Sequence, residues 1–207
     1  MDSYLVPARD ATAEIEVKRS RFLCRVARVE SEEDARAVIA EERRAYGTAG
    51  HHCSAFILGP DAGTLRSNDD GEPSGTAGPP ILDALQGAQL SDVVAVVTRW
   101  FGGTLLGTGG LVQAYGDATR AALAVAGSRR RELRQRLETT VDFAIAGRLE
   151  DQLRRLGTVE VDYDTGRPRM QVAVAPAEAG EVSTLVLTAS NGQAPIAELS
   201  PIWVDAD

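Results

Sequence analysis

The chain begins with two segments in which hydrophobic and polar residues alternate, at positions 12–17 and 21–29. Alternation with a period of two is typical of half-buried strands, so a β-hairpin is expected there. After Ser31, three acidic residues precede apolar positions that recur at helical spacing as far as Arg44. This pattern predicts a capped amphipathic helix behind the hairpin.

The next part of the chain predicts two strands, a long loop and a second helix. The strands are expected at 53–58 and 64–67, with a turn between them. Residues 68–80 contain too many glycines and prolines for a regular element, and long ordered loops are often functional. The prolines that end this loop suit the first turn of a helix that runs through Leu85.

A continuous run of β-branched residues at 93–98 is typical of a strand that is buried on both faces. It is followed by a second glycine-rich segment, 102–110. Apolar positions then recur at helical spacing over 111–125, and they predict a long helix that ends near Gly127.

An arginine-rich stretch follows this helix and is interpreted as the boundary between two domains: Arg129, Arg130, Arg131, Arg134 and Arg136. The remaining segments predict the βαββαβ order of a ferredoxin-like domain, with strands at 137–143, 158–163, 170–175 and 194–204 and helices at 147–156 and 177–190. The expected fold class is therefore α+β, with domains at 1–132 and 133–207.

The composition narrows the class of protein. Hydrophobic residues make up 43% and charged residues 25% of the chain, which suits a globular protein with a core. No apolar stretch approaches the roughly 18 residues of a membrane-spanning helix, and residues 1–10 lack the apolar middle of a signal peptide. We therefore expect a soluble, cytoplasmic protein with no membrane contact.

The net charge of −8 excludes a surface that binds nucleic acid through bulk positive potential, so any anion site must be local. The arginine-rich stretch is the strongest local basic patch. Cys24 and Cys53 both lie in strand-like segments, and two cysteines cannot form a metal site without other ligands. We expect buried, reduced thiols.

Three motifs resemble the signatures of one family. Residues 69–82 read DDGEPSGTAGPPIL, residues 96–116 contain VVTRWFGG and LGTGGLV, and residues 18–22 read KRSRF. A His-x-Cys pair stands at 51–53. Together these motifs resemble the YigZ/IMPACT family, and the resemblance extends over residues 14–123.

The resemblance implies an N-terminal α/β sandwich like the second domain of small-subunit ribosomal protein five. It also implies a C-terminal domain like one in elongation factor G. Eukaryotic relatives regulate translation under starvation, so the implied partners are RNA, the ribosome or translation factors, with no cofactor and no established reaction. Pro79, Leu105 and Gln113 stand where family members commonly carry basic residues.

The first group of candidate site residues would bind an anion or nucleic acid: Arg99, Gly102, Gly103, Gly107, Thr108, Gly109 and Gly110. Glycines directly ahead of a helix expose unpaired amides at the positive end of the helix dipole, and they let a phosphate approach the backbone. The arginine could stack on a base or hold a phosphate. The alternative is that these glycines only let two loops pack tightly.

The second group is the motif loop: Asp69, Asp70, Gly71, Glu72, Pro73, Ser74, Gly75 and Thr76. Its three carboxylates could bind a divalent cation or act as acid and base. Alternatively, the aspartates bond turn amides while Glu72 pairs with Arg99 or Arg66. The two histidines, at 51 and 52, suit either a base or ligand near neutral pH or a structural role at a strand entrance. No catalytic residue is assigned, and a metal is left open.

The sequence leaves three functions open. The first is a binding protein that acts in translation through RNA, ribosome or translation-factor contact. The second is a phosphate-binding or nucleotide-binding enzyme of unknown reaction, and the third is a module that binds a protein partner through the sheet of the second domain. The first two depend on segments 69–78 and 99–110 folding together to line one concavity.

Overall fold

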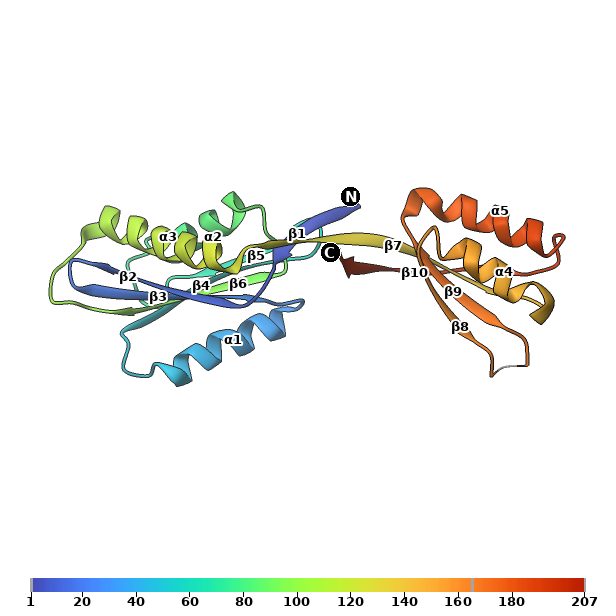
Figure 1. Ribbon diagram of the computed structural model, residues 1–207. Coiled ribbons are helices and arrows are strands. Elements are labelled where there is room, and N and C mark those ends of the chain that lie inside the picture. The colour runs from blue at the N-terminus through green and yellow to red at the C-terminus, as the bar shows by residue number, and fades with distance from the viewer. Residues whose placement is uncertain (1, 165, 207) are drawn as a thin grey trace. The chain divides into compact units, whose positions relative to one another are not determined.

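The computed structural model describes residues 2–164 and 166–206, and Figure 1 shows their helices and strands. The chain divides into two compact units, which comprise residues 3–130 and 131–206. Both contain an antiparallel sheet with helices packed on it, and together they hold five α-helices. The α+β fold class is therefore confirmed. In the described part of the chain, no helix has the length and apolar character needed to cross a membrane.

The first unit is built on a five-stranded antiparallel sheet. Its spatial order is β2 (Ala11–Val17), β3 (Ser20–Arg28), β6 (Val93–Trp100), β4 (His51–Leu58) and β5 (Thr64–Asn68). A further short strand, β1 (Ser3–Pro7), was not expected from the sequence; Leu5 in β1 bridges to Leu90.

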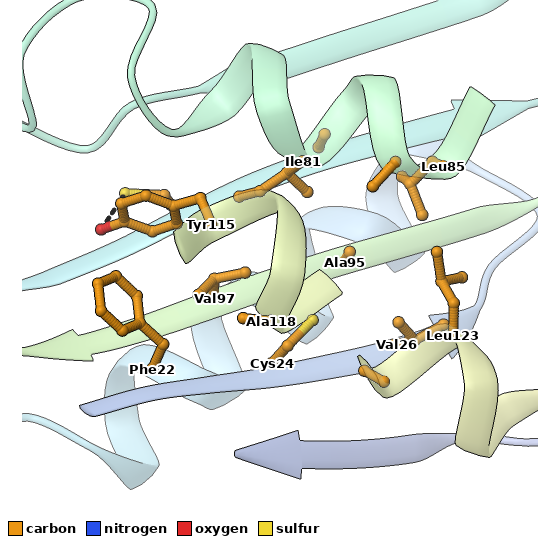
Figure 2. Packing of buried hydrophobic residues seen from close by; sticks show 14 of the residues in the cluster. Phe22, Cys24, Val26, Ile81, Leu85, Ala95, Val97, Tyr115, Ala118 and Leu123 are labelled. Atoms are coloured by element: carbon orange, nitrogen blue, oxygen red, sulfur yellow. Dashed lines mark hydrogen bonds between the residues drawn. The ribbon is translucent and has the colours of Figure 1, made fainter. Parts of the chain in front are cut away.

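Helices cover both faces of this sheet, as Figure 1 shows. One face packs against α2 (Gly78–Gly87) and α3 (Gly107–Ala126), and the other against α1 (Glu32–Ala45). The central strand β6 is buried on both sides, as its β-branched run predicts. In the larger core, Phe22 of β3, Val97 of β6 and Tyr115 of α3 lie in one layer (Figure 2).

Short sequence features determine where the helices of the first unit begin. The Ser31 hydroxyl accepts a hydrogen bond from the Asp34 amide at 3.1 Å, which caps α1 as expected. Prolines occupy the first turn of α2. Helix α3 begins earlier than its apolar pattern indicated, because residues 107–110 form its first turn instead of preceding it. As the first turn, these four residues are followed by helix but not preceded by it.

The second unit has the ferredoxin-like order of strands, β10–β7–β9–β8. Its elements are β7 (Ser128–Thr140), α4 (Phe143–Leu153), β8 (Thr158–Asp162), β9 (Arg169–Val174), α5 (Ala179–Ala189) and β10 (Ile196–Asp205). A 3₁₀ turn, Pro176–Glu178, leads into α5. The helices pack on one face of the sheet around residues such as Leu149 and Met170.

The arginine-rich stretch was interpreted as the boundary between two domains, and the division between the two compact units falls within it, between Arg130 and Arg131. All five arginines lie within β7. Arg131, Arg134 and Arg136 lie opposite residues of β10, and Arg136 also lies opposite Ala173 of β9. Arg136 donates to Gln171 at 2.8 Å, and Arg134 pairs with Glu132 at 2.7 Å. Strand pairing and these side-chain contacts stabilise the extended conformation of this segment, although its sequence pattern does not predict a strand.

Candidate functional site

The motif loop is organised around the side chain of Asp69. Its two carboxylate oxygens accept hydrogen bonds from the amides of Gly75, Ala77 and Gly78 at 2.8, 3.0 and 2.8 Å. Partial burial raises the pKa of this carboxyl, but the three amide donors outweigh it and hold the pKa below its usual value. Asp69 is thus a charged structural hub that closes the loop onto the start of α2.

The next residue, Asp70, fastens the loop to β4. Its carboxylate accepts from the His52 amide at 2.6 Å and pairs with Arg43 of α1. Its carbonyl oxygen lies 2.8 Å from His51 Nδ1. The φ angle of Asp70 is 45°, in the left-handed region that short polar residues tolerate better than most. The loop is therefore held at two points before it reaches Glu72.

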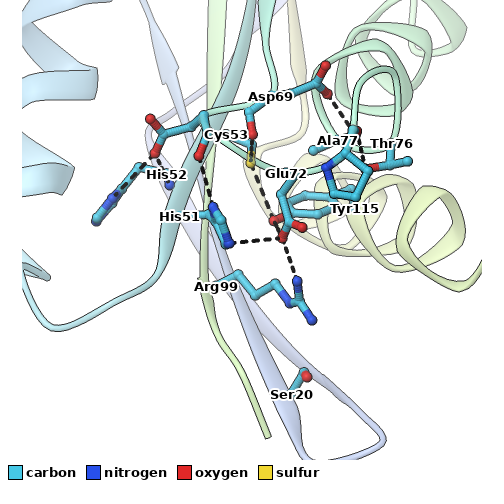
Figure 3. A network of polar contacts seen from close by, with 12 residues as sticks. Ser20, His51, His52, Cys53, Asp69, Glu72, Thr76, Ala77, Arg99 and Tyr115 are labelled. Carbon is cyan, nitrogen blue, oxygen red and sulfur yellow. Dashed lines mark hydrogen bonds and ion pairs between the residues drawn. The ribbon is translucent and has the colours of Figure 1, made fainter. Parts of the chain in front are cut away.

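The side chain of Glu72 is the centre of a buried polar network, which Figure 3 shows. Its Oε1 accepts from Arg99 Nη1 at 2.5 Å and from the Tyr115 hydroxyl at 2.6 Å, while His51 Nε2 lies 3.8 Å away. Glu72 is only 8% exposed and Arg99 6%. A carboxylate and a guanidinium at this depth are stable only because each is the other's counter-ion.

Tyr115 connects this network to the core. The Cys53 thiol donates to the Tyr115 oxygen at 3.3 Å and lies 3.0 Å from the Asp69 carbonyl, and the ring of Phe22 packs edge-on against Tyr115 at 5.2 Å. Burial, followed by the neighbouring Cys53 and Glu72, raises the pKa of the Tyr115 phenol. Tyr115 therefore stays a neutral donor to Glu72.

The three carboxylates of the loop do not converge. Asp69 bonds turn amides, Asp70 bonds β4 and α1, and Glu72 bonds Arg99 and Tyr115. No group of three acidic, histidine or cysteine side chains is placed to hold a metal ion within the described residues. This arrangement matches the structural alternative considered for the loop, in which Glu72 pairs with Arg99.

Both cysteines are free and buried, as expected. Burial is the largest cause that raises the pKa of each thiol, to about 12 for Cys24 and about 12 for Cys53. At pH 8 the native thiolate fraction is then about 10⁻⁴, against roughly a quarter for an unperturbed thiol. We expect a thiol-reactive disulfide reagent to modify neither cysteine in the folded protein within minutes, and both in denaturant.

The raised pKa values of both thiols also predict how the free energy of unfolding depends on pH. Above pH 9 the unfolded thiols ionise while the native ones stay protonated, so the free energy of unfolding should fall as the pH rises from 9 to 12. Fast modification of one native thiol at pH 8 would contradict the burial of that side chain.

The glycine-rich segment packs against the turn of the β2–β3 hairpin. The Gly102 amide donates to Ser20 Oγ at 3.1 Å, and a Cβ at Gly102 would lie 2.0 Å from the Arg19 carbonyl carbon. The Arg19 guanidinium donates to Thr104 Oγ1 at 3.0 Å. Gly102 is therefore required by a close backbone approach between the segment and the hairpin.

The first turn of α3 is open. A Cβ at Gly103, Gly107 or Gly109 would meet no atom within 4 Å, and these residues and Thr108 are exposed. No side chain caps the amides of the helix, whose N-cap residue is Leu106. The exposed amides of a 20-residue helix offer an anion the positive end of its dipole.

The end of β6 adjoins the β2–β3 hairpin, because Arg21 lies opposite Trp100 and Arg19 contacts Thr104. We name the cations and aromatic residues of these two segments the basic aromatic surface: Lys18, Arg19, Arg21, Trp100 and Phe101. Arg21 Cζ lies 3.9 Å from the centre of the Trp100 ring, although the same guanidinium also pairs with Glu14 at 3.4 Å. Phe101 is 57% exposed. The sequence supplied the KRSRF motif, but it did not indicate that this motif adjoins residues 100–104.

The predicted site residues thus fall into two groups. Arg99 joins Glu72 in the buried network, whereas Gly102 and Gly103 adjoin the hairpin turn, next to the open turn of α3. The Glu72–Arg99 ion pair links segment 69–78 with segment 99–110. A concavity shared by both segments stays a prediction, as does an anion-binding role for Arg99.

Comparisons with known proteins agree with the motifs. The profile of the Impact N-terminal domain matches residues 18–123. The chain is 35% identical over 200 residues to the IMPACT family member YvyE of Bacillus subtilis, which covers 96% of this chain and 92% of that protein. It is 45% identical over 125 residues to the family member YigZ of Escherichia coli, covering 59% and 61% of the two chains.

A solved structure described as the crystal structure of an hypothetical protein resembles the whole chain. Its TM-score is 0.70 at 34% sequence identity, and the match covers 97% of this chain and 98% of the other. Motifs, domain profile and full-length relatives lead to one conclusion. This chain belongs to the YigZ/IMPACT family.

Proposed function

We propose that this protein is a binding protein that acts in translation by contacting RNA, on the ribosome or with a translation factor. The contact surface would be the basic aromatic surface together with the open first turn of α3. The observation that carries the proposal is the β2–β3 turn, whose Arg19 contacts Thr104 and closely approaches Gly102, in the segment between the exposed Phe101 and the uncapped start of α3.

The conformation of this turn supports a role beyond folding. Lys18 and Arg19 have φ angles of 48° and 65°, in the left-handed region that two-residue hairpin turns fill with asparagine and glycine. A side chain with a Cβ costs roughly 1–2 kcal/mol per residue there. Non-glycine residues held in such a conformation are enriched at functional sites.

The chemistry of the surface fits a single RNA strand. Phe101 offers an exposed ring on which a base can stack, and stacking is worth about 1–3 kcal/mol per base. The cations at the turn can neutralise phosphates, and the amides of residues 107–109 can bind one phosphate without further charge. A local site of this kind is compatible with the net charge of −8.

In the double variant Lys18→Asn with Arg19→Gly, we expect the protein to become more stable and to bind RNA more weakly. The unfolding free energy should rise by about 1–2 kcal/mol, because the new residues suit the left-handed turn. Binding to a labelled single-stranded RNA decamer, followed by fluorescence anisotropy, should weaken. For the parent protein, log K against log salt should have a slope of about −2 for three neutralised phosphates.

A matched control removes two positive charges elsewhere. Arg44 and Arg120 are exposed residues outside this surface, and the variant with asparagine at both positions should bind RNA as the parent does. If both double variants lost RNA affinity equally, the effect would come from net charge and not from the hairpin turn. No RNA binding at low salt, and no pelleting with ribosomes, would contradict the proposal.

A phosphate-binding enzyme is the second candidate, favoured by the open glycine turn of α3 alone. Nucleotides with Mg²⁺ should then raise the melting temperature, because a ligand at 100 times its Kd adds about 2.7 kcal/mol. The variant Gly109→Val would narrow the approach to the amides and should remove that shift. A screen in which no nucleotide changes the melting temperature would exclude this candidate.

A further inference from the structure

The edge strand of the first sheet borders a groove on the α1 side. Strand β5 pairs with β4 on one side only and ends the strand order. Residues 65–68 are exposed. The Arg66 guanidinium donates to the carbonyl of Leu65 at 2.9 Å. Because β5 ends the strand order, no strand of the described chain pairs with its outer side, and an additional strand could pair there beyond the Leu65 carbonyl that Arg66 engages.

The groove between β5 and α1 has a volume of about 260 Å³. Its lining includes two apolar side chains, Ile39 of α1 and Phe56 of β4, next to Ser54 of β4. Three arginines line it: Arg36 and Arg43 from α1, and Arg66 from β5. A floor that suits an apolar side chain, under a rim of guanidinium groups, is a recognition site for a chain that alternates apolar and acidic residues.

The charge of this rim contrasts with that of the whole protein. Arg36 and Arg66 are 73% and 61% exposed, and both contact the single lining carboxylate, Glu32, at 2.8 and 3.8 Å. Arg43 pairs with Asp70. Two exposed guanidinium groups that share one carboxylate leave a local positive excess on a chain of net charge −8. An acidic ligand would satisfy that excess.

We propose that the β5 edge and its groove bind an extended acidic segment of a protein partner by strand addition. The occupant is a polypeptide because an open strand edge presents main-chain donors and acceptors that only another strand matches in register. Its alternate side chains would enter the groove, with apolar residues over Ile39 and Phe56 and carboxylates at Arg36 and Arg66. This surface uses none of the residues of the basic aromatic surface.

The test is a selection of phage-displayed random dodecapeptides on the full-length protein. We expect enrichment of sequences that alternate apolar and acidic residues. The enriched peptide, labelled with fluorescein, should bind at least roughly tenfold more weakly to the double variant R36E/R66E, because the new glutamates on the rim repel an acidic peptide. N-methylation of alternate peptide amides should also abolish binding, because it removes the main-chain donors.

The matched control is Arg44→Glu combined with Arg120→Glu, which makes the same charge change away from the groove. Circular dichroism confirms that each variant is folded. The proposal is overturned if no peptide is enriched, or if the enriched peptide binds the groove variant as well as the parent. It is equally overturned if R36E/R66E impairs binding of the RNA decamer instead of the peptide.

Discussion

Replacing Glu72 with alanine is expected to destabilise the first unit by about 3–5 kcal/mol, the usual cost of leaving one partner of a buried ion pair alone. Arg99 would keep its charge at 6% exposure without a counter-ion, and the Tyr115 hydroxyl would lose its acceptor. Urea unfolding followed by the fluorescence of Trp100, in a Trp203→Phe background, reports on this unit alone.

Two further variants separate charge from packing. Glu72→Gln keeps an acceptor for Tyr115 but removes the charge. Its free energy of unfolding should therefore lie between those of the parent and the alanine variant. Adding Arg99→Met to Glu72→Ala should recover part of the loss, because the unpaired cation is then gone. If Glu72→Ala lowered the free energy of unfolding by less than about 1 kcal/mol, Arg99 would be solvated by water and the polar network would be accessible to solvent.

The second large effect is expected at Gly102, where alanine should cost roughly 3 kcal/mol or more through overpacking against backbone. The added Cβ would lie 2.0 Å from the Arg19 carbonyl carbon and 2.4 Å from the Ser20 amide nitrogen. Neither is the far end of a flexible side chain, so the hairpin turn must move. Unfolding curves and RNA anisotropy on the same protein should both register this displacement.

Gly109→Ala is the matched control. It lies in the first turn of α3, where a Cβ meets no atom within 4 Å, and alanine favours helix by up to about 1 kcal/mol. This variant should therefore be as stable as the parent or more stable. If Gly102→Ala were equally harmless, the close approach between residue 102 and the hairpin would be wrong.

Signals that act within a few residues were sufficient to predict most of the fold. The Ser31 cap, the prolines at the start of α2 and the β-branched run of β6 act locally, and each element formed where it was expected. Helix α3 began earlier because residues 107–110 lack apolar side chains, which are the only signal that periodicity uses. Arg131, Arg134 and Arg136 of β7 lie in a strand because the β9 and β10 backbones pair with this part of the chain.

The candidate site was predicted less completely, because its contacts join distant residues. The Glu72–Arg99 pair was among the alternatives considered, but its extension to Tyr115, 43 residues further along the chain, depends on how α3 crosses the sheet. The placement of Lys18 and Arg19 was missed because their left-handed turn opposes their own preferences. Such local conflicts are expected where a site serves something besides folding.

The two candidate segments therefore differ in what they suggest about function. The motif loop has its carboxylates engaged by the fold, through Asp69 and Glu72. The hairpin turn and the start of α3 keep cations, a ring and amides exposed. We propose that the loop fixes the end of β6 in place and that the basic aromatic surface contacts RNA.

The most direct measurement is an NMR titration of the ¹⁵N-labelled full-length protein with the single-stranded RNA decamer. If the basic aromatic surface binds RNA, salt-sensitive shifts are expected for the amides of Lys18, Arg19, Phe101, Gly107 and Gly109, with β5 and the second unit unchanged. Saturating binding with shifts confined to β7 or to the groove beside β5, and none at the hairpin turn, would contradict it.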